Sequence, residues 1–286
     1  MSRLGVFHDP GLSDDEALAV LRGTVLEPLG VLTQASNLTL LVELREQDGG
    51  LTGHRAVYKP VRGERPLRDF PPGSLGAREA AAYLVSRAGG FDVVPPTVLR
   101  DGPLGPGSVQ WWVDQEPERL ADPSGGLVEV LTPDQLGPGW LAVVSGEDED
   151  GGEVVVAHAD DPGLRRMAVL DVLLNNADRK AAHLTLDPRG RLRGFDHGLC
   201  LHVDDKLRTV LWGWAGQPLV EEELELVDRL RAAMDPGAEG GAGAALLDLL
   251  DPAEVEALRD RAQVLLATGR FPPAPGDRYP LPWPLW

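Results

Sequence analysis

NNADRKAAHLTLDPRGRLRGFDHG, residues Asn175–Gly198, is the part of this sequence from which the fold follows. Within eight residues it places four groups that can bind or react with a ligand: Asn176, Asp178, Arg179 and His183. The turn signal Asp187–Gly190 then stands between two short apolar pairs and predicts a hairpin. This hairpin leads to a second carboxylate, Asp196. Charged groups between apolar segments are costly to bury unless they are paired or bound, so the stretch is a candidate site.

The composition is that of a folded globular protein. The chain has 286 residues, enough for one large domain or two modest lobes with a buried core. Its single cysteine, Cys200, excludes an internal disulfide and any multi-cysteine metal site. Neither a basic and apolar leader nor an apolar run of membrane-spanning length is found in the sequence. We therefore expect a cytoplasmic protein without integral membrane association.

The charge of the chain limits its partners. A net charge of −18 argues against nucleic acid, whose binding depends on clustered lysine and arginine. The segment Asp114–Asp161 holds 13 acidic residues against one basic residue. Its densest tract, Glu147–Asp150, is expected to be a solvated loop. A metal-collecting role is the alternative, although four acids in a row lack the spacing of a calcium loop.

Residues 1–113 predict a small antiparallel lobe with one helix packed on its sheet. A capping box predicts a first short helix over Ser13–Leu21. Alternation and turn signals predict five strands, at Gly30–Leu32, Leu38–Leu44, Arg55–Tyr58, Thr97–Leu99 and Ser108–Val113. Apolar spacing predicts the packed helix over Ser74–Ala88.

Residues 114–286 predict a larger, mainly helical region. It should contain a short strand at Val154–Val156, a buried helix over Leu164–Leu174, and a helix over Val220–Met234. A pair of terminal helices follows, the last starting at Asp251-Pro252. Residues 271–286, rich in proline and aromatic residues, should form an extended strap laid on the body.

The order of these features resembles the protein-kinase-like superfamily. The closer likeness is to its atypical branch, the phosphatidylinositol 3- and 4-kinase-like and HipA-type kinases. Those families carry N-x-D-x-x-x-x-N followed by a D-x-G-like motif. This chain has Asn176-Ala177-Asp178 with His183 five residues later, then Asp196-His197-Gly198. The sequence is also similar to an actinobacterial phosphatidylinositol-kinase-like family.

The resemblance implies a bilobal α+β fold and an ATP- and Mg²⁺- or Mn²⁺-dependent phosphotransferase. Asp178 would orient the acceptor hydroxyl and take its proton. Asp196 would bind the metal ion that bridges the nucleotide phosphates. Arg179 would either offset charge near the transferred phosphoryl group or pair with an acid.

Nucleotide-binding residues are expected in the first lobe. Lys59, at the end of a strand, would pair with Glu79 and point its ammonium at the phosphates; alone it would be an ordinary surface lysine. The loop Thr33–Asn37 lies where a glycine-rich loop is expected, so Ser36 and Asn37 would supply donors to phosphate. The alternative is an ordinary polar hairpin. Val113 ends the strand that would hold adenine through its backbone, with Trp111 and Trp112 on opposite faces.

His183 departs from the pattern, which has asparagine at this position. Its ring nitrogen suits manganese or zinc better than magnesium. Either the second metal position is altered, or His183 binds phosphate, or the protein is a nucleotide-binding pseudokinase with a regulatory role. AMP transfer on the same fold is a third possibility. A protein or soluble metabolite is favoured over a lipid as acceptor, because the charge of −18 opposes anionic membranes.

Overall fold

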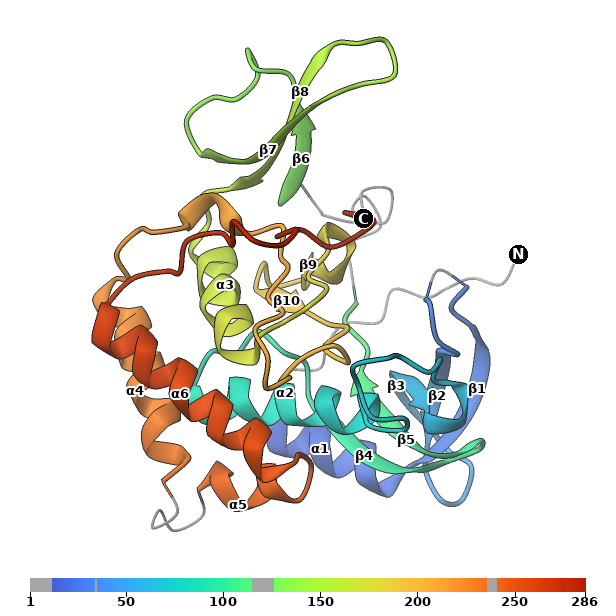
Figure 1. Ribbon diagram of the computed structural model, residues 1–286. Helices are drawn as coiled ribbons and strands as arrows, with labels where there is room; N and C mark the ends of the chain where they lie inside the picture. Colours follow the sequence, from blue (N-terminus) through green and yellow to red (C-terminus); the bar gives the residue numbers. More distant parts are fainter. Residues whose placement is uncertain (1–11, 34, 115–125, 236–240) are drawn as a thin grey trace.

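The computed structural model describes residues 12–33, 35–114, 126–235 and 241–286 (Figure 1). The first lobe contains α1 (Asp14–Gly23), β1 (Val25–Val31), β2 (Leu40–Arg45), β3 (Leu51–Pro60), the short 3-10 turn η1 (Val61–Gly63), α2 (Leu75–Gly89), β4 (Thr97–Gly102) and β5 (Gly105–Trp111). All five expected strands and both expected helices are present. The first lobe therefore holds two helices, since α1 also contacts β4 and β5.

The first-lobe sheet is antiparallel, with the strand order β1-β2-β3-β5-β4. The chain leaves the central strand β3, runs through α2 and returns at the edge of the sheet as β4, so that α2 contacts β5 and β4. Leu40, Tyr58, Val109 and Val98 stand opposite one another in register and are buried on one face. The next residue of β3, Lys59, points to the opposite face because side chains alternate along a strand.

Helix α2 lies on the Lys59 face of the sheet. A side chain at Gly76 would put its Cβ 3.3 Å from the backbone nitrogen of Ser108, which is the register partner of Lys59. A glycine at this position therefore lets the helix approach the sheet closely. Glu79 is one turn further along and faces the end of β3. The helix ends at Gly90, whose φ of 77° places it in the left-handed region.

The second lobe contains the remaining elements. These are β6 (Val128–Leu131), β7 (Trp140–Glu147), β8 (Glu153–Ala159), α3 (Pro162–Leu174), η3 (Ala181–His183), β9 (Leu184–Leu186), β10 (Leu192–Gly194), η4 (Trp212–Trp214), α4 (Glu221–Ala233), α5 (Ala242–Leu247) and α6 (Pro252–Thr268). Asp161 caps α3 through Leu164 N at 3.0 Å, and proline occupies its first turn. Helix α3 is buried through Met167, Leu170 and Leu173, and it packs on α2 and α6.

The segment before α3 contains two strands, β6 and β7, that the sequence did not predict. It forms a three-stranded sheet with the order β6-β8-β7, which projects from the body in Figure 1. Only its central strand was predicted, because the acidic and glycine residues around β7 hide the apolar residues of that strand. The tract Glu147–Asp150 is exposed at the β7–β8 turn, as expected for a solvated loop. Residues 115–125 of the acidic segment lie outside the described residues.

The last residues form the expected extended strap. The strap crosses over α3 toward β9 (Figure 1) and buries Leu281. Its backbone accepts hydrogen bonds from the second lobe: Pro280 O from Thr209 N at 3.2 Å, and Leu285 O from Ala181 N at 2.9 Å. The strap is thus hydrogen-bonded to Ala181, which follows Arg179 in the sequence, and to Thr209, which pairs with Arg179 in a β-bridge. No helix in the described parts of the chain is long and apolar enough to cross a bilayer.

Candidate active site

Three charged side chains meet between the lobes. The ammonium of Lys59, at the end of β3, forms an ion pair with Glu79 of α2. The same Nζ lies 2.7 Å from Oδ1 of Asp196. The second oxygen of Glu79 accepts the backbone N–H of His197 at 3.0 Å. Strand, helix and the end of the β9–β10 hairpin are therefore joined through one lysine and one glutamate.

The charges in this cluster stabilise one another. Desolvation alone would lower the pKa of Lys59, but Asp196 and Glu79 outweigh it and raise that pKa above its ordinary value. Desolvation would likewise raise the pKa of Asp196, yet the charge of Lys59 holds it well below its ordinary range. Lys59 is therefore cationic and Asp196 is anionic at neutral pH.

Asp196 is presented by a short hairpin and a strained backbone. Strands β9 and β10 pair over Leu184–Leu186 and Leu192–Gly194, as the turn signal predicted. Asp187 closes the turn by accepting the backbone N–H groups of Arg189 and Arg191. Asp196 itself has a φ of 60°, in a region that non-glycine residues rarely occupy. Such outliers concentrate at functional sites, and this one directs the carboxylate, whose side chain is 48% exposed, toward Lys59.

Asp178 is held by the loop that follows α3. Asn175 ends the helix with a φ of 51°, and Asn176 Oδ1 accepts the backbone N–H of Asp178 at 3.0 Å. Burial raises the pKa of Asp178 to about 6, with Lys180 acting in the opposite direction and the charge of Asp196 adding to the increase. A carboxylate with a pKa near neutrality is suited to general base catalysis.

Arg179 has a structural position. Its guanidinium and the carboxylate of Asp171 are both fully buried, and its Nε lies 2.9 Å from Asp171 Oδ2. It also donates to Phe195 O at 3.0 Å. Of the two roles expected for Arg179, pairing with an acid is therefore the one that the structure supports. The prediction that it faces a transferred phosphoryl group is corrected, because the side chain has no access to the cleft.

Two histidines flank Asp196. Nε2 of His183 lies 3.3 Å from Asp196 Oδ2, and burial lowers the pKa of His183 to about 4, so the ring is neutral. His197 is fully buried with its Nε2 2.6 Å from Arg179 Nη2, so this nitrogen accepts and Nδ1 carries the proton. The structure thus brings His183 next to Asp196.

Two polar residues of the site were not singled out from the sequence. Lys180 places Nζ 3.3 Å from Asp178 Oδ2. Asp171 binds both Arg179 and the Asn176 amide, at 2.9 Å. The sequence did indicate Lys180, since it lies only two residues after Asp178, the expected base. Asp171 was only weakly indicated by the sequence, because a single acidic residue within a buried helix produces no periodic pattern.

Ser36 and Asn37, predicted to donate to phosphate, lie in the loop between β1 and β2. Ser36 is exposed, while Asn37 Oδ1 accepts the backbone N–H of Arg65 at 2.9 Å. The Asn37 carbonyl is thus committed to the neighbouring segment, and its NH₂ group remains as a donor. Gln34 lies outside the described residues.

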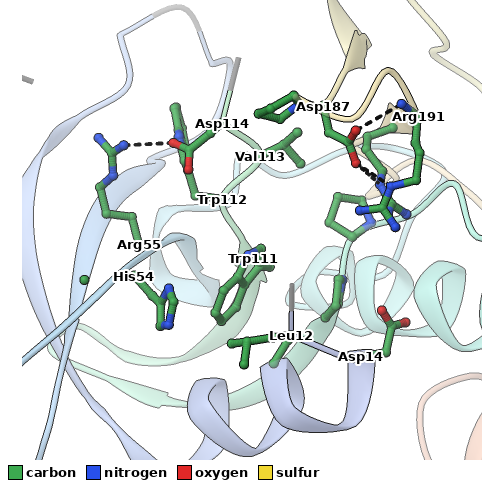
Figure 2. A pocket seen from close by; sticks show the side chains of 16 residues that line it. Leu12, Asp14, His54, Arg55, Trp111, Trp112, Val113, Asp114, Asp187 and Arg191 are labelled. Carbon is green, nitrogen blue, oxygen red and sulfur yellow. Dashed lines mark hydrogen bonds and ion pairs between the residues drawn. The ribbon is translucent and has the colours of Figure 1, made fainter. Parts of the chain in front are cut away.

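Val113 lies beside a pocket at the junction of the lobes (Figure 2). Trp111 points toward His54, with ring centroids 4.8 Å apart, and Trp112 lies 5.7 Å from the guanidinium carbon of Arg55. The pocket, of about 80 Å³, also includes the β9–β10 turn. Lys59, Glu79, Asp178 and Asp196 do not line it. The pocket is therefore separate from the charged cluster around Lys59.

The residues at Asp196 fit a metal ion that arrives with nucleotide. No group of three or more His, Cys, Asp or Glu side chains among the described residues is arranged to hold a metal. Mg²⁺ in phosphoryl-transfer sites is usually held by one or two carboxylates together with substrate phosphates and water. Asp196 supplies such a carboxylate, with His183 Nε2 beside its other oxygen.

The sheet, its helix and the paired Lys59, Glu79 and Asp196 define a bilobal protein of the kinase-like fold class. The chain is 49% identical over 276 residues to Protein Rv2133c of Mycobacterium tuberculosis, a match that covers 96% of each protein. It belongs to the same family as that protein. No family model matches the sequence.

Two solved structures resemble the chain distantly. The structure of hydra Fam20 with sugar has a TM-score of 0.47 and 14% identity, covering 92% of this chain and 91% of that one. The proinflammatory kinase CtkA of Helicobacter pylori has a TM-score of 0.41 and 12% identity, covering 85% of this chain and 96% of that one.

Proposed function

We propose that this protein is an ATP- and divalent-metal-dependent phosphotransferase. The observation that carries the proposal is the position of Lys59 between Glu79 and Asp196, with Asp178 near enough for the charge of Asp196 to raise its pKa. A cation fixed by a helix carboxylate, an acid that can bind metal and a base with a pKa near neutrality are the groups that phosphoryl transfer requires. We also place the lobe boundary between Val113 and Asp114, and the relationship to the phosphatidylinositol-kinase-like and HipA-type branches belongs to the same proposal.

Each residue has a defined task in this proposal. Lys59 binds nucleotide phosphate oxygens, and Glu79 keeps its ammonium directed at the cleft. Ser36 and Asn37 donate to the phosphates, and Val113 holds the base through its backbone. Asp178 accepts the proton of the acceptor hydroxyl, while Lys180 limits how far its pKa rises. Arg179 and Asp171 position the loop. Asp196, with His183, would hold Mg²⁺ or Mn²⁺, which supplies positive charge to the phosphates when bound.

Nucleotide-dependent thermal stabilisation tests the site directly. We expect ATP with Mg²⁺ or Mn²⁺ to raise the melting temperature of the wild type, and Asp196→Ala to remove most of that increase. The exposed Glu222→Ala variant on α4 serves as the control, since the Glu222 carboxylate pairs with Arg166 at the surface. Full metal-dependent stabilisation of Asp196→Ala by ATP would rule out the assignment.

A pseudokinase is the second candidate, favoured by one observation. Asp196 contacts both Lys59 and His183, so two basic side chains already occupy the carboxylate that should bind metal. ATP turnover with a protein or soluble metabolite acceptor, lost in Asp178→Ala, excludes this candidate. Nucleotide binding without turnover in any tested metal supports it.

A further inference from the structure

The segment Val61–Leu75, which we name the arginine loop, connects the strand of Lys59 to the helix of Glu79. It carries three exposed arginines, Arg62, Arg65 and Arg68. None of their guanidinium groups forms an ion pair with a residue that the structure describes. In a chain with a net charge of −18, a group of exposed arginines without ion-pair partners among the described residues is unusual. Such a group creates a positive surface that attracts anions.

The acids of the arginine loop do not neutralise these arginines. Glu64 accepts the backbone N–H of Gly76 at 3.2 Å, at the start of α2. Asp69 pairs with Lys206 at 2.8 Å. Both carboxylates are therefore engaged with partners on other segments, and the exposed charge of the loop is positive.

The arginine loop is fixed at the entrance of the site. Its Arg65 N–H is donated to Asn37 of the phosphate-loop candidate, at 2.9 Å. On the other side, Lys206 connects the loop to the catalytic segment, because its own backbone N–H is donated to Asn175 Oδ1 at 2.8 Å. Phe70 packs against His202, with ring centroids 5.4 Å apart. A molecule bound on this loop would therefore be near both the phosphates and Asp178.

An apolar pocket accompanies the cations. It has a volume of about 290 Å³, and its lining includes Arg65, Leu67, Phe70 and Glu64, whose carboxylate accepts the Gly76 N–H. Leu67 is 40% exposed. Apolar contacts bordered by positive charge suit an extended peptide that has one apolar side chain and several acidic ones. An anionic membrane fits less well, because the remaining surface is strongly acidic.

We propose that the arginine loop is the docking surface for an acidic segment of a protein acceptor. This inference rests on the proposed phosphotransferase function and names its substrate class. Specificity comes from charge complementarity at Arg65 and Arg68 and from the pocket at Leu67. The acceptor hydroxyl would then lie on the Asp178 side of the bound segment.

Fluorescence anisotropy with a labelled acidic peptide tests the proposal. The peptide contains glutamate and aspartate around one leucine, and a matched peptide replaces the acids with their amides. We expect the wild type to bind only the acidic peptide, more weakly at higher salt. R65E/R68E should weaken binding by about tenfold or more, since attraction becomes repulsion at two sites. R22E/R229E, which reverses two exposed arginines on α1 and α4, should bind normally.

Other results would overturn the docking surface. These are absence of acidic-peptide binding, equal weakening in both double variants, or binding to phosphatidylserine vesicles without binding to the peptide. The ATP-induced thermal shift of R65E/R68E separates docking from nucleotide binding. It should be unchanged because Arg65 contacts Asn37 through its backbone; its loss would assign the arginines to nucleotide. Peptide binding by a wild type that does not bind ATP would instead contradict the proposed phosphotransferase and leave the acidic-segment surface in place.

Discussion

Lys59 and Asp196 are 137 positions apart in the sequence, yet Nζ of the first lies 2.7 Å from Oδ1 of the second. This contact joins the sheet of the first lobe to the hairpin of the second. Glu79 contacts the same ammonium and also the backbone of His197. The contacts of Lys59 and Glu79 therefore both hold the two lobes together and form the site. A substitution at Lys59 should affect the packing of the lobes as well as the site.

The Lys59→Met variant should lose nucleotide affinity. Removing the ammonium deletes a charge-assisted contact to phosphate and leaves Glu79, whose side chain is 3% exposed, without its cation. We expect metal–ATP affinity to fall by about tenfold or more, corresponding to loss of a contact of ~1.5–3 kcal/mol. Isothermal titration calorimetry measures this independently of stability. Arg231→Met, at an exposed pair on α4, is the control, and equal affinity of the two variants would contradict the role of Lys59.

The sequence was sufficient to predict the parts of the site that follow motif order. Lys59 lies near the end of a strand and Glu79 in the first turns of a helix, and Asp178 and Asp196 flank a hairpin with a clear turn signal, so local patterns locate them. Asp171 could not be found this way. Its role depends on which buried group stands opposite it, and burial of a charge pair is a tertiary property that leaves no periodic trace.

Charge also misled the interpretation of the segment before α3. Its acids suggested a solvated loop, although Trp140–Glu147 pairs with β8 along most of its length. The acids gather at the turn, where they are solvated, while the apolar residues of the strand are only partly covered. Arg179 shows the converse: its charge left two roles open, facing the phosphoryl group or pairing with an acid, and the structure pairs it with the buried Asp171 of α3.

Removing one partner of the buried Asp171–Arg179 pair should reduce the free energy of unfolding more than removing one partner of a surface pair. Both side chains are fully buried, so Arg179→Met leaves an uncompensated carboxylate. We expect a loss of about 3–5 kcal/mol in the free energy of unfolding, measured by urea denaturation. Arg166→Ala, which breaks an exposed pair with Glu222, should cost less than about 1 kcal/mol.

A double variant separates pairing from packing at this position. Asp171→Leu combined with Arg179→Met removes both charges, so it should be more stable than Arg179→Met alone. If the double variant is the less stable of the two, the loss in Arg179→Met does not arise from the unpaired charge of Asp171.

The rate of phosphoryl transfer should depend on the ionisation of Asp178. Burial raises its pKa to about 6, and only the deprotonated form accepts a proton. Turnover should therefore fall as the pH decreases through about 6. The charge of Lys180 lowers this pKa, so Lys180→Met should move the acid limb of kcat/KM to higher pH. The exposed Arg166→Met variant should leave the limb in place, and an unchanged limb in Lys180→Met would show that Asp178 is not the titrating base.

His183→Asn tests whether the departure from the kinase pattern sets metal preference. The neutral imidazole of His183, with its pKa lowered to about 4, offers nitrogen beside Asp196. Asparagine offers an oxygen, which magnesium prefers. We expect the ratio of Mg²⁺- to Mn²⁺-supported ATP binding, measured by calorimetry, to increase. His54→Asn, at the pocket of Figure 2, is the matched control, and the same ratio in both variants would remove His183 from the metal site.

Removal of residues 278–286 should reduce turnover while sparing nucleotide affinity. The strap supplies Leu285 O to Ala181 N at 2.9 Å and Pro280 O to Thr209 N at 3.2 Å, on both sides of the Asp178 loop. Without these acceptors Ala181 N and Thr209 N lose their backbone partners, so the segment after Asp178 is held less firmly. Lys59, Glu79 and Asp196 keep their contacts. The buried Leu281→Ala variant should cost about 2–4 kcal/mol in stability and lower kcat as well. Trp283→Ala, at a side chain that is 80% exposed, should change stability by less than about 0.5 kcal/mol. Equal kcat values for the truncated and full chains, at saturating metal–ATP, would show that the strap does not position the catalytic loop.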